Sequence, residues 1–191
     1  MGLFRFFENR LEVYPEDNYN LPTDNFLKFL WACTKGLRGW IFAFMFLTGL
    51  IGVYESLLYK WIGDIVNWLG AYTPANLWAE KGDSLLMMAA VLVVSPILVG
   101  LSSLIHFQTL QGVFPMQMRW RFHRQMLGQS MEFYQDEFSG RVSAKVMQTA
   151  LAVRDTIMTI ADMLVYVLVY FVSSGIILFH LDGWLLIPFL L

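Results

Sequence analysis

The segment spanning residues 85–118 contains 34 residues and not one lysine, arginine, aspartate or glutamate. Its first 21 residues are almost wholly apolar, which matches the ~20 residues that a helix needs to cross roughly 30 Å of hydrocarbon. Beyond Ile105 the segment turns polar without becoming charged, and it then meets a basic cluster of Arg119, Arg121 and Arg124. We therefore expect a membrane helix that leaves the bilayer and continues into water.

The composition also favours a membrane protein. Hydrophobic residues make up 57% of the chain and charged residues 15%, against about 25% charged in soluble domains. The net charge of −2 provides no broad basic surface, so nucleic acid is not expected as a partner. The single cysteine, Cys33, has no disulfide partner, and His106, His123 and His180 are too scattered for a metal site. We predict an all-α integral membrane fold with no catalytic or metal-ligating residue.

Two further apolar runs, residues 39–54 and 163–181, are long enough to span with their aromatic and polar ends included. A last run, 184–191, has eight apolar residues, less than half of a span. A helix that stops in lipid leaves its last carbonyls without partners, so we expect the chain to be the N-terminal part of something longer. The predicted membrane domain covers 37–191, with spans at about 37–69, 84–128 and 140–181 and a truncated fourth at 184–191.

The distribution of lysine and arginine predicts the orientation. These residues gather in 1–38 and again between the second and third apolar runs. By contrast, segment 70–83 contains only Lys81, and the turn at 180–183 contains neither residue type. Because basic loops stay on the cytoplasmic side, the N-terminus is expected in the cytoplasm. The expected location is the plasma membrane, as a multi-pass protein of a bacterial inner membrane.

A short amphipathic helix is predicted over residues 23–36, after a flexible segment at 1–22. Thr23, Asp24 and Asn25 are the candidate N-cap residues. Aromatic and aliphatic residues then alternate with two lysines, which favours an elbow helix lying on the inner membrane surface. The alternative is a simple N-terminal extension of the first span.

The helices predicted at 84–128 and 140–181 are too long for a bilayer. About 45 residues at 1.5 Å each give roughly 65 Å, and subtracting about 30 Å of hydrocarbon leaves a comparable length outside. We expect two antiparallel helices that project together, joined by a tip at 129–138. This tip holds three acidic and three aromatic residues. Exposed rings there would be costly unless covered, either by a partner or by the hairpin's own helices, and the spacing does not choose between the two.

Several short patterns follow one another around this tip. They are Arg119, Arg121 and Arg124, then Met126-Leu127-Gly128, Met131 to Tyr134, Ser139-Gly140-Arg141 and Lys145-Val146. Together they resemble the first intracellular loop of ABC exporters. The elbow helix and the turn at Asp182-Gly183-Trp184 also resemble that family, and the resemblance covers roughly residues 20–191 in order.

The resemblance implies a coupling helix that docks on nucleotide-binding domains, with Phe133 and Tyr134 as the expected buried contacts. Its residues would be Ser130, Met131, Glu132, Phe133, Tyr134, Gln135, Asp136 and Glu137. It further implies a second transporter half or a homodimer partner, in addition to membrane lipid. ATP and Mg would belong to the full-length, ATP-hydrolysing protein, because the chain contains no GxxxxGK[ST] motif and no Gly-Lys dipeptide at all.

An intramembrane pair is predicted from the register of the hairpin. Counting from Tyr134, His106 lies 28 residues before and Asp162 lies 28 residues after. In a straight antiparallel pair of helices these two residues would share a depth, where an unpaired aspartate is costly. We therefore predict a contact between His106 and Asp162, either as a structural clamp or as part of an inward-facing cavity.

Charged residues follow the first apolar run near the expected outer interface. Lys60 and Asp64 are spaced i,i+4 and are candidates for a modest ion pair. Glu55 lies closest to lipid, where it either faces a translocation path or reaches water at the interface.

Two classes of function fit these features. The first is the N-terminal part of an ABC exporter's membrane domain, in which the tip carries nucleotide-binding-domain motion to an alternating-access pathway. The second is a small membrane scaffold or assembly factor whose cytoplasmic hairpin binds a soluble partner. A membrane enzyme finds no support, since neither a histidine cluster nor an acidic cluster is present.

Overall fold

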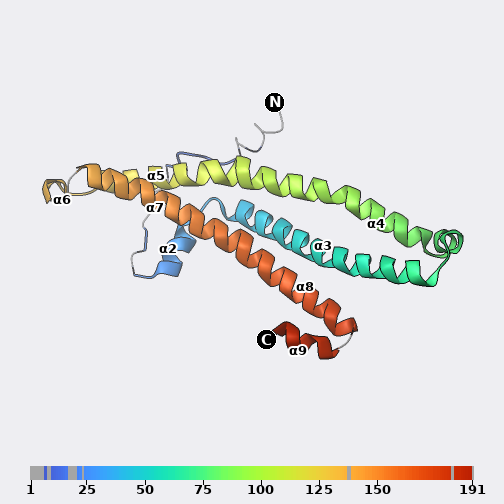
Figure 1. Cartoon of the computed structure of the whole chain (residues 1–191). Helices are drawn as coiled ribbons and strands as arrows, with labels where there is room; N and C mark the ends of the chain where they lie inside the picture. Colours follow the sequence, from blue (N-terminus) through green and yellow to red (C-terminus); the bar gives the residue numbers. More distant parts are fainter. Residues whose placement is uncertain are drawn as a thin grey trace. The chain divides into compact units, whose positions relative to one another are not determined.

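The computed structural model describes residues 7, 10–16, 21–22, 24–136, 139–181 and 183–190. All regular elements in this part of the chain are helical, so the predicted all-α fold class is confirmed (Figure 1). Thr23, Glu137, Phe138 and Asp182, which entered the predictions above, lie outside the described residues. In chain order the elements are α2 (Phe26–Cys33), α3 (Arg38–Ala71), α4 (Pro74–Ser103), the π-helix η1 (Leu104–Gln111), α5 (Gly112–Leu127), α6 (Met131–Asp136), α7 (Ser139–Thr159), the π-helix η2 (Ile160–Leu164), α8 (Val165–Leu181), the 3-10 helix η3 (Gly183–Leu185) and α9 (Leu186–Leu190).

Within the ranges given above, three helical stretches are long and apolar enough to cross a membrane. They are Arg38–Ala71, Asn76–Leu127 and Gly140–Leu181, with 34, 52 and 42 residues. The most apolar windows of the last two are only 6% and 0% buried. Apolar surface of this extent needs a covering of lipid or protein. The second stretch begins earlier than the predicted residue 84. Its first residues include charged ones, which a helix can carry outside hydrocarbon, and Pro74 suits the first position of α4.

The chain divides into two compact units. Unit 1 comprises Met1–Phe44 and Ser103–Ala161, and unit 2 comprises Met45–Ser102 and Asp162–Leu191. One boundary falls just before the π-helical segment η1, and another falls within η2. Each unit is considered below by itself.

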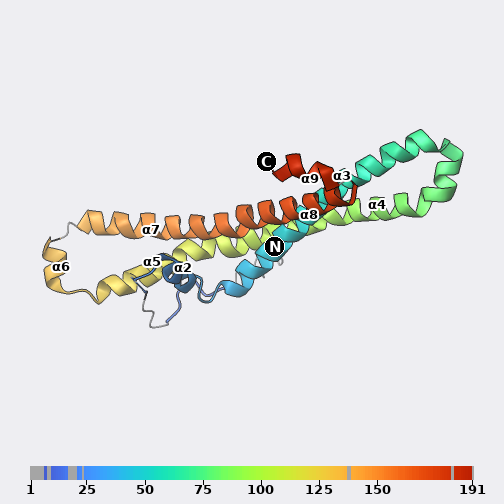
Figure 2. The same ribbon diagram turned by 90° about the horizontal axis from the view of Figure 1, so that it is seen from below.

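The core of unit 1 lies where α5 packs against α7 (Figure 2). Phe114 and Met118 on α5 are wholly buried, one helical turn apart. On α7, Ala150 is also fully buried, which lets the two helices approach closely, and Ile157 continues the same face two turns later. Burying each large apolar side chain contributes about 1.5–3 kcal/mol, so this face holds the two helices together.

The elbow helix α2 is shorter than predicted and begins at Phe26. Of the three candidate caps, Asn25 is the N-cap: its Oδ1 accepts hydrogen bonds from the backbone N–H groups of Leu27 at 2.9 Å and Lys28 at 3.4 Å. After the helix, Gly36 has φ +87°, a left-handed conformation that favours glycine and turns the chain toward α3. One face of α2 is buried at Leu30 and Cys33. The exposed face carries Phe26, Leu27 and Trp31.

In unit 2, α3 and α8 pack closely at a glycine. A side chain added at Gly52 would place its Cβ 3.5 Å from the backbone oxygen of Tyr166 and 3.5 Å from the backbone nitrogen of Tyr170. The short helix α9 returns onto α8, where Phe189 stacks on Phe171 with ring centroids 4.6 Å apart. Unit 2 therefore contains a tight helix pair with a C-terminal cap of aromatic contacts.

Candidate functional site

The segment predicted as a coupling tip forms a short, well-defined helix, α6, after a tight turn at the end of α5. The backbone N–H of Gly128 donates to Gln125 O at 3.3 Å, and that of Gln129 donates to Met126 O at 2.9 Å. These bonds satisfy carbonyls that the end of a helix leaves open. Ser130 then caps α6, because its Oγ accepts the N–H of Phe133 at 3.3 Å.

Tyr134 ties α6 to α5. Its hydroxyl donates a 2.6 Å hydrogen bond to the backbone oxygen of Met126, and its ring meets Phe133 edge-on with centroids 5.4 Å apart. Phe133 is half-buried. Both rings predicted as buried partner contacts thus have contacts within the hairpin itself, which was the other alternative left open by their spacing.

Among the described residues at this end, the most exposed apolar side chains are Met131, at 74% exposure, and Leu127, at 70%. Glu132 and Gln135 are exposed beside them. Met131 belongs to the predicted site, whereas Leu127 contributed only to the sequence pattern. The available signal was its place directly before Gly128, where the helix was expected to end.

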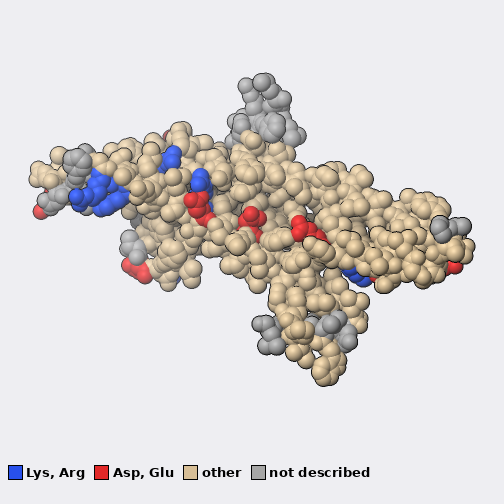
Figure 3. Space-filling view, in the orientation of Figure 1, with Lys and Arg blue, Asp and Glu red and all other residues tan. Residues whose placement is uncertain are grey.

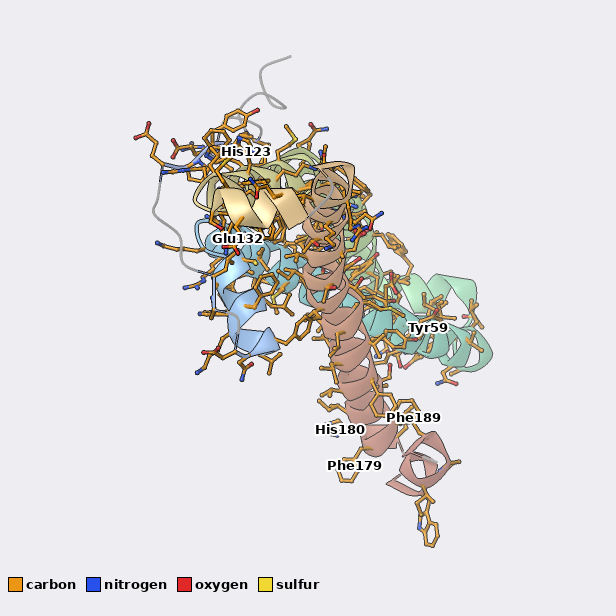
Figure 4. The ribbon with its side chains drawn as sticks, turned by 90° about the vertical axis from the view of Figure 1, so that its left-hand side faces the viewer. Tyr59, His123, Glu132, Phe179, His180 and Phe189 are labelled. Carbon is orange, nitrogen blue, oxygen red and sulfur yellow. The ribbon has the colours of Figure 1, made fainter. Side chains whose placement is uncertain are left out.

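A cavity of about 370 Å³ lies beneath α6. Arg119 and His123 line it from α5, Tyr134 from α6, and Val142 and Val146 from α7. Figure 3 shows Lys and Arg side chains gathered next to α6, and Figure 4 labels His123 and Glu132 at this end. This end of unit 1 therefore offers two exposed apolar side chains, Leu127 at the end of α5 and Met131 at the start of α6, in a basic surrounding, an arrangement suited to binding.

Arg121, on α5, donates hydrogen bonds to backbone carbonyls at the end of the elbow helix. Its side chain is 6% exposed and donates to Cys33 O at 3.3 Å and to Lys35 O at 2.8 Å. A cation there also complements the negative end of the α2 dipole. Burial raises the pKa of the Cys33 thiol to about 11, while the charge of Arg121 acts in the lowering direction.

The N-terminal segment also lies on α5. The Gln117 amide donates to Glu12 O at 2.9 Å, and the Trp120 indole donates to Pro15 O at 3.1 Å. The ring of Tyr14 meets that of Trp120 edge-on at 5.3 Å. Backbone carbonyl acceptors leave no mark in a sequence, so this docking was not predicted, and the flexibility of 1–22 stays a prediction.

His106 and Asp162 each lie in a π-helical segment, η1 and η2 respectively. The His106 ring packs against Phe44, with centroids 4.9 Å apart, and Asp162 accepts a 3.4 Å hydrogen bond from the hydroxyl of Thr48. The first contact lies within unit 1 and the second within unit 2. A π-helix winds differently from an α-helix, so counting residues along straight helices does not fix this register, and the predicted pairing of His106 with Asp162 stays a prediction.

Of the acidic residues of α3, Glu55 has a partner that was not expected, and Asp64 lacks the partner that was expected. Glu55 accepts a hydrogen bond from the hydroxyl of Tyr166, which no sequence pattern singled out. Lys60 and Asp64 form neither an ion pair nor a hydrogen bond within the described part of the chain, so the predicted pair is wrong. Such a pair contributes only about 0.2–0.5 kcal/mol, too little to hold the exposed Lys60 and the half-buried Asp64 in one geometry.

Known proteins provide one informative match. No protein-family model matches the chain, and no solved structure matches it. A Haemophilus influenzae protein named "Uncharacterized ABC transporter ATP-binding protein" is 56% identical over 188 residues. The chain is related to an ABC transporter protein. The match covers 98% of this chain, and the chain spans 31% of the length of that relative.

This ABC relationship and the three apolar helices together indicate a membrane location. They agree with the general part of the resemblance found in the sequence. The exporter type, the bacterial inner membrane, the cytoplasmic N-terminus and the dimer stay predictions.

Proposed function

We propose that this chain is part of the membrane domain of an ABC exporter and that α6 docks on a nucleotide-binding domain. The observation that carries the proposal is the placement of α6: a capped helix of six residues between α5 and α7, with Met131 and Leu127 exposed at its start. The relative's name includes ATP binding, and about two thirds of that protein lies outside the match. An ATP-binding domain would belong to that remaining part.

The exposed side chains suit a docking contact. Burying Met131 and Leu127 in a groove would contribute about 1.5–3 kcal/mol each, and methionine adapts readily to the shape of a partner surface. Glu132 and Gln135 would stay at the polar rim of such a contact. Phe133 and Tyr134 would then support α6 from within rather than fill the partner's groove.

The contacts of unit 1 support a route by which motion at α6 would reach the rest of the unit. Tyr134 ties α6 to the last turn of α5 through Met126. Arg121 and Gln117 in turn tie α5 to the elbow helix and to the N-terminal segment. A shift of α6 on ATP binding by the partner would therefore move α5 together with the elements attached to it. ATP and Mg would bind the nucleotide-binding domain, and alternating access would follow from this movement.

The proposed orientation places the N-terminus and α6 in the cytoplasm of a bacterial cell. The exposed face of α2, formed by Phe26, Leu27 and Trp31, would lie on the inner membrane surface. The basic residues near α6 would face the cytoplasm, as the positive-inside rule requires.

Cysteine crosslinking of the full-length protein tests the docking role. In a Cys33→Ala background, Gln135→Cys is paired with cysteines introduced on the candidate ATPase domain. Gln148→Cys, an equally exposed glutamine on α7, is the matched control. We expect a crosslink from position 135 and none from position 148. Absence of a crosslink at positions 131, 132 and 135 in an assembled protein contradicts the proposal, and a crosslink to a protein without ATPase activity favours the scaffold alternative.

A further inference from the structure

A cleft opens between α3 and α8 in unit 2, next to their closest contact. The hydroxyl of Ser56 donates to Gly52 O at 3.0 Å and lies 3.4 Å from the hydroxyl of Ser174. Beyond this contact a cavity of about 360 Å³ lies between the two helices, within the size range of small-molecule sites. Tyr59, labelled in Figure 4, lines the cavity from α3.

Opposite charges line the α3 side of this cleft. Lys60 and Asp64 both face it, and within the described residues neither forms an ion pair or a hydrogen bond. Counted from Gly39 at 1.5 Å per residue, they lie about 32 Å and about 38 Å along the helix. A bilayer's hydrocarbon core is about 30 Å thick, so a span that begins at Gly39 brings both charges to the headgroup level.

The α8 side of the cleft is apolar. It is formed by Ile177, Leu178 and Leu181, with the hydroxyl of Ser174 near the closest contact. A ligand that fits must therefore carry a negative group for Lys60, a positive group for Asp64 and an apolar portion for α8. Within the described residues no side chain pairs with Lys60 or Asp64, and burying either charge without a partner would be costly.

We propose that this cleft binds a zwitterionic phospholipid of the surrounding bilayer, of the phosphatidylethanolamine type. The phosphate accepts hydrogen bonds from the Lys60 ammonium, and the lipid ammonium donates to the Asp64 carboxylate. One acyl chain lies along Ile177 and Leu178. A lipid with a net negative headgroup fits less well, because Asp64 repels the second negative charge. This binding does not depend on the docking role of α6.

Lipid retention by the full-length protein tests the proposal. The protein is reconstituted in nanodiscs of mixed phosphatidylethanolamine and phosphatidylglycerol, extracted, and its bound lipids are counted by native mass spectrometry. Lys60→Gln removes the phosphate partner and should lower retention of both lipids. Asp64→Asn should lower phosphatidylethanolamine retention about tenfold and remove the preference over phosphatidylglycerol, since a hydrogen bond to a charged group is lost. Lys81→Gln and Asp83→Asn, outside the cleft, are the matched controls.

A second measurement tests whether the cleft is open to lipid. In the Cys33→Ala background, Leu178→Cys is labelled with a lipid-soluble maleimide in bilayers with and without phosphatidylethanolamine. Protection that depends on this lipid supports the proposal. Equal protection in both bilayers means that protein fills the cleft, and this overturns the proposal, as does an unchanged lipid ratio in Asp64→Asn. The α6 crosslink enters neither readout, so failure of the docking role is recognised separately.

Discussion

The guanidinium of Arg121 donates a 2.8 Å hydrogen bond to the backbone oxygen of Lys35, and so a buried side chain of α5 closes the end of the elbow helix. Arg38 supports the same helix end from α3, donating to Trp31 O at 2.9 Å. Carbonyls at a helix end need such donors, and the planar fork of arginine reaches two at once. The elbow helix is therefore held on the core of unit 1 by hydrogen bonds as well as by apolar packing.

Removal of this fork should destabilise unit 1. Arg121→Ala removes the donor to the carbonyls of Cys33 and Lys35. Cys33 is fully buried, and loss of a hydrogen-bond partner there has an expected cost of about 1–3 kcal/mol. Arg121→Lys keeps the charge but loses the bidentate geometry. Its stability should therefore lie between that of Arg121→Ala and that of the unchanged protein. Thermal unfolding in detergent measures both variants. Arg141→Ala, at an exposed position, is the control, and an equal loss of stability in that control would contradict the role of Arg121.

The hydroxyl of Tyr134 should matter more for coupling than for folding. Tyr134→Phe removes the hydrogen bond to Met126 O, worth about 0.5–1.5 kcal/mol, and keeps the ring. We expect the ATPase rate of the full-length protein to respond less to conditions that change transport, with membrane insertion unchanged. Tyr54→Phe on α3 is the control. The coupling route is wrong if Tyr134→Phe behaves like Tyr54→Phe in ATPase assays and in crosslinking from position 135.

Cys33 should resist alkylation near neutral pH. Its side chain is 0% exposed, and burial raises the pKa of its thiol from 9.0 to about 11, so the reactive thiolate is scarce. An exposed cysteine at Gln135→Cys should react with iodoacetamide much faster at pH 8. Rapid labelling of native Cys33 at that pH would contradict the buried position.

The same thiol makes a pH-dependent contribution to stability. Because its pKa is higher in the folded state than in the unfolded state, the contribution is complete below about pH 9 and is lost as the pH rises through about 11. The decline in unfolding midpoint between these values should be smaller in Cys33→Ala. Parallel curves for the two proteins would show that other groups dominate.

The close approach of α3 and α8 depends on Gly52. Gly52→Leu places a side chain against the backbone of Tyr166 and should cost about 1–3 kcal/mol by overpacking, despite the better helix propensity of leucine. Gly100→Leu is the matched control, because nothing lies within 4 Å of a Cβ at Gly100. Thermal unfolding of both variants checks this contact, and similar midpoints would contradict it.

Asp162 should couple to Thr48. In a double-mutant cycle of Thr48→Val and Asp162→Asn, we expect non-additivity of about 0.6 kcal/mol, the usual size for a hydrogen bond between membrane helices. The pairing predicted from the sequence is tested by exchanging His106 and Asp162. Rescue of the single alanine variants by the exchange would support that pairing, and its absence would leave Thr48 as the partner of Asp162.

The predictable features were those that depend on local composition. The uncharged run from residue 85 onward was enough to indicate a membrane helix, and the break between Gly128 and Ser130 indicated where the helix pair turns. The helix α4 begins at Pro74, about ten residues before the predicted start. Charged residues near Glu80 are typical of loops as well as of helix ends outside the membrane, and the sequence does not distinguish the two. The cap at Asn25 was one of three candidates, since neighbouring polar residues compete for that role.

Apolar length and the spacing of charges therefore settled the fold class, which over the described residues is all-helical with three helices able to span a bilayer. Both signals are summed over many residues, so no single contact alters them. The partners of individual polar groups were decided only in three dimensions. Arg121 donates to the carbonyl of Lys35, 86 residues away in the sequence, and Glu55 accepts a hydrogen bond from Tyr166. Lys60 and Asp64 form no ion pair within the described residues. Backbone acceptors are the same at every position in a sequence, and helix packing determines which of them a side chain can reach.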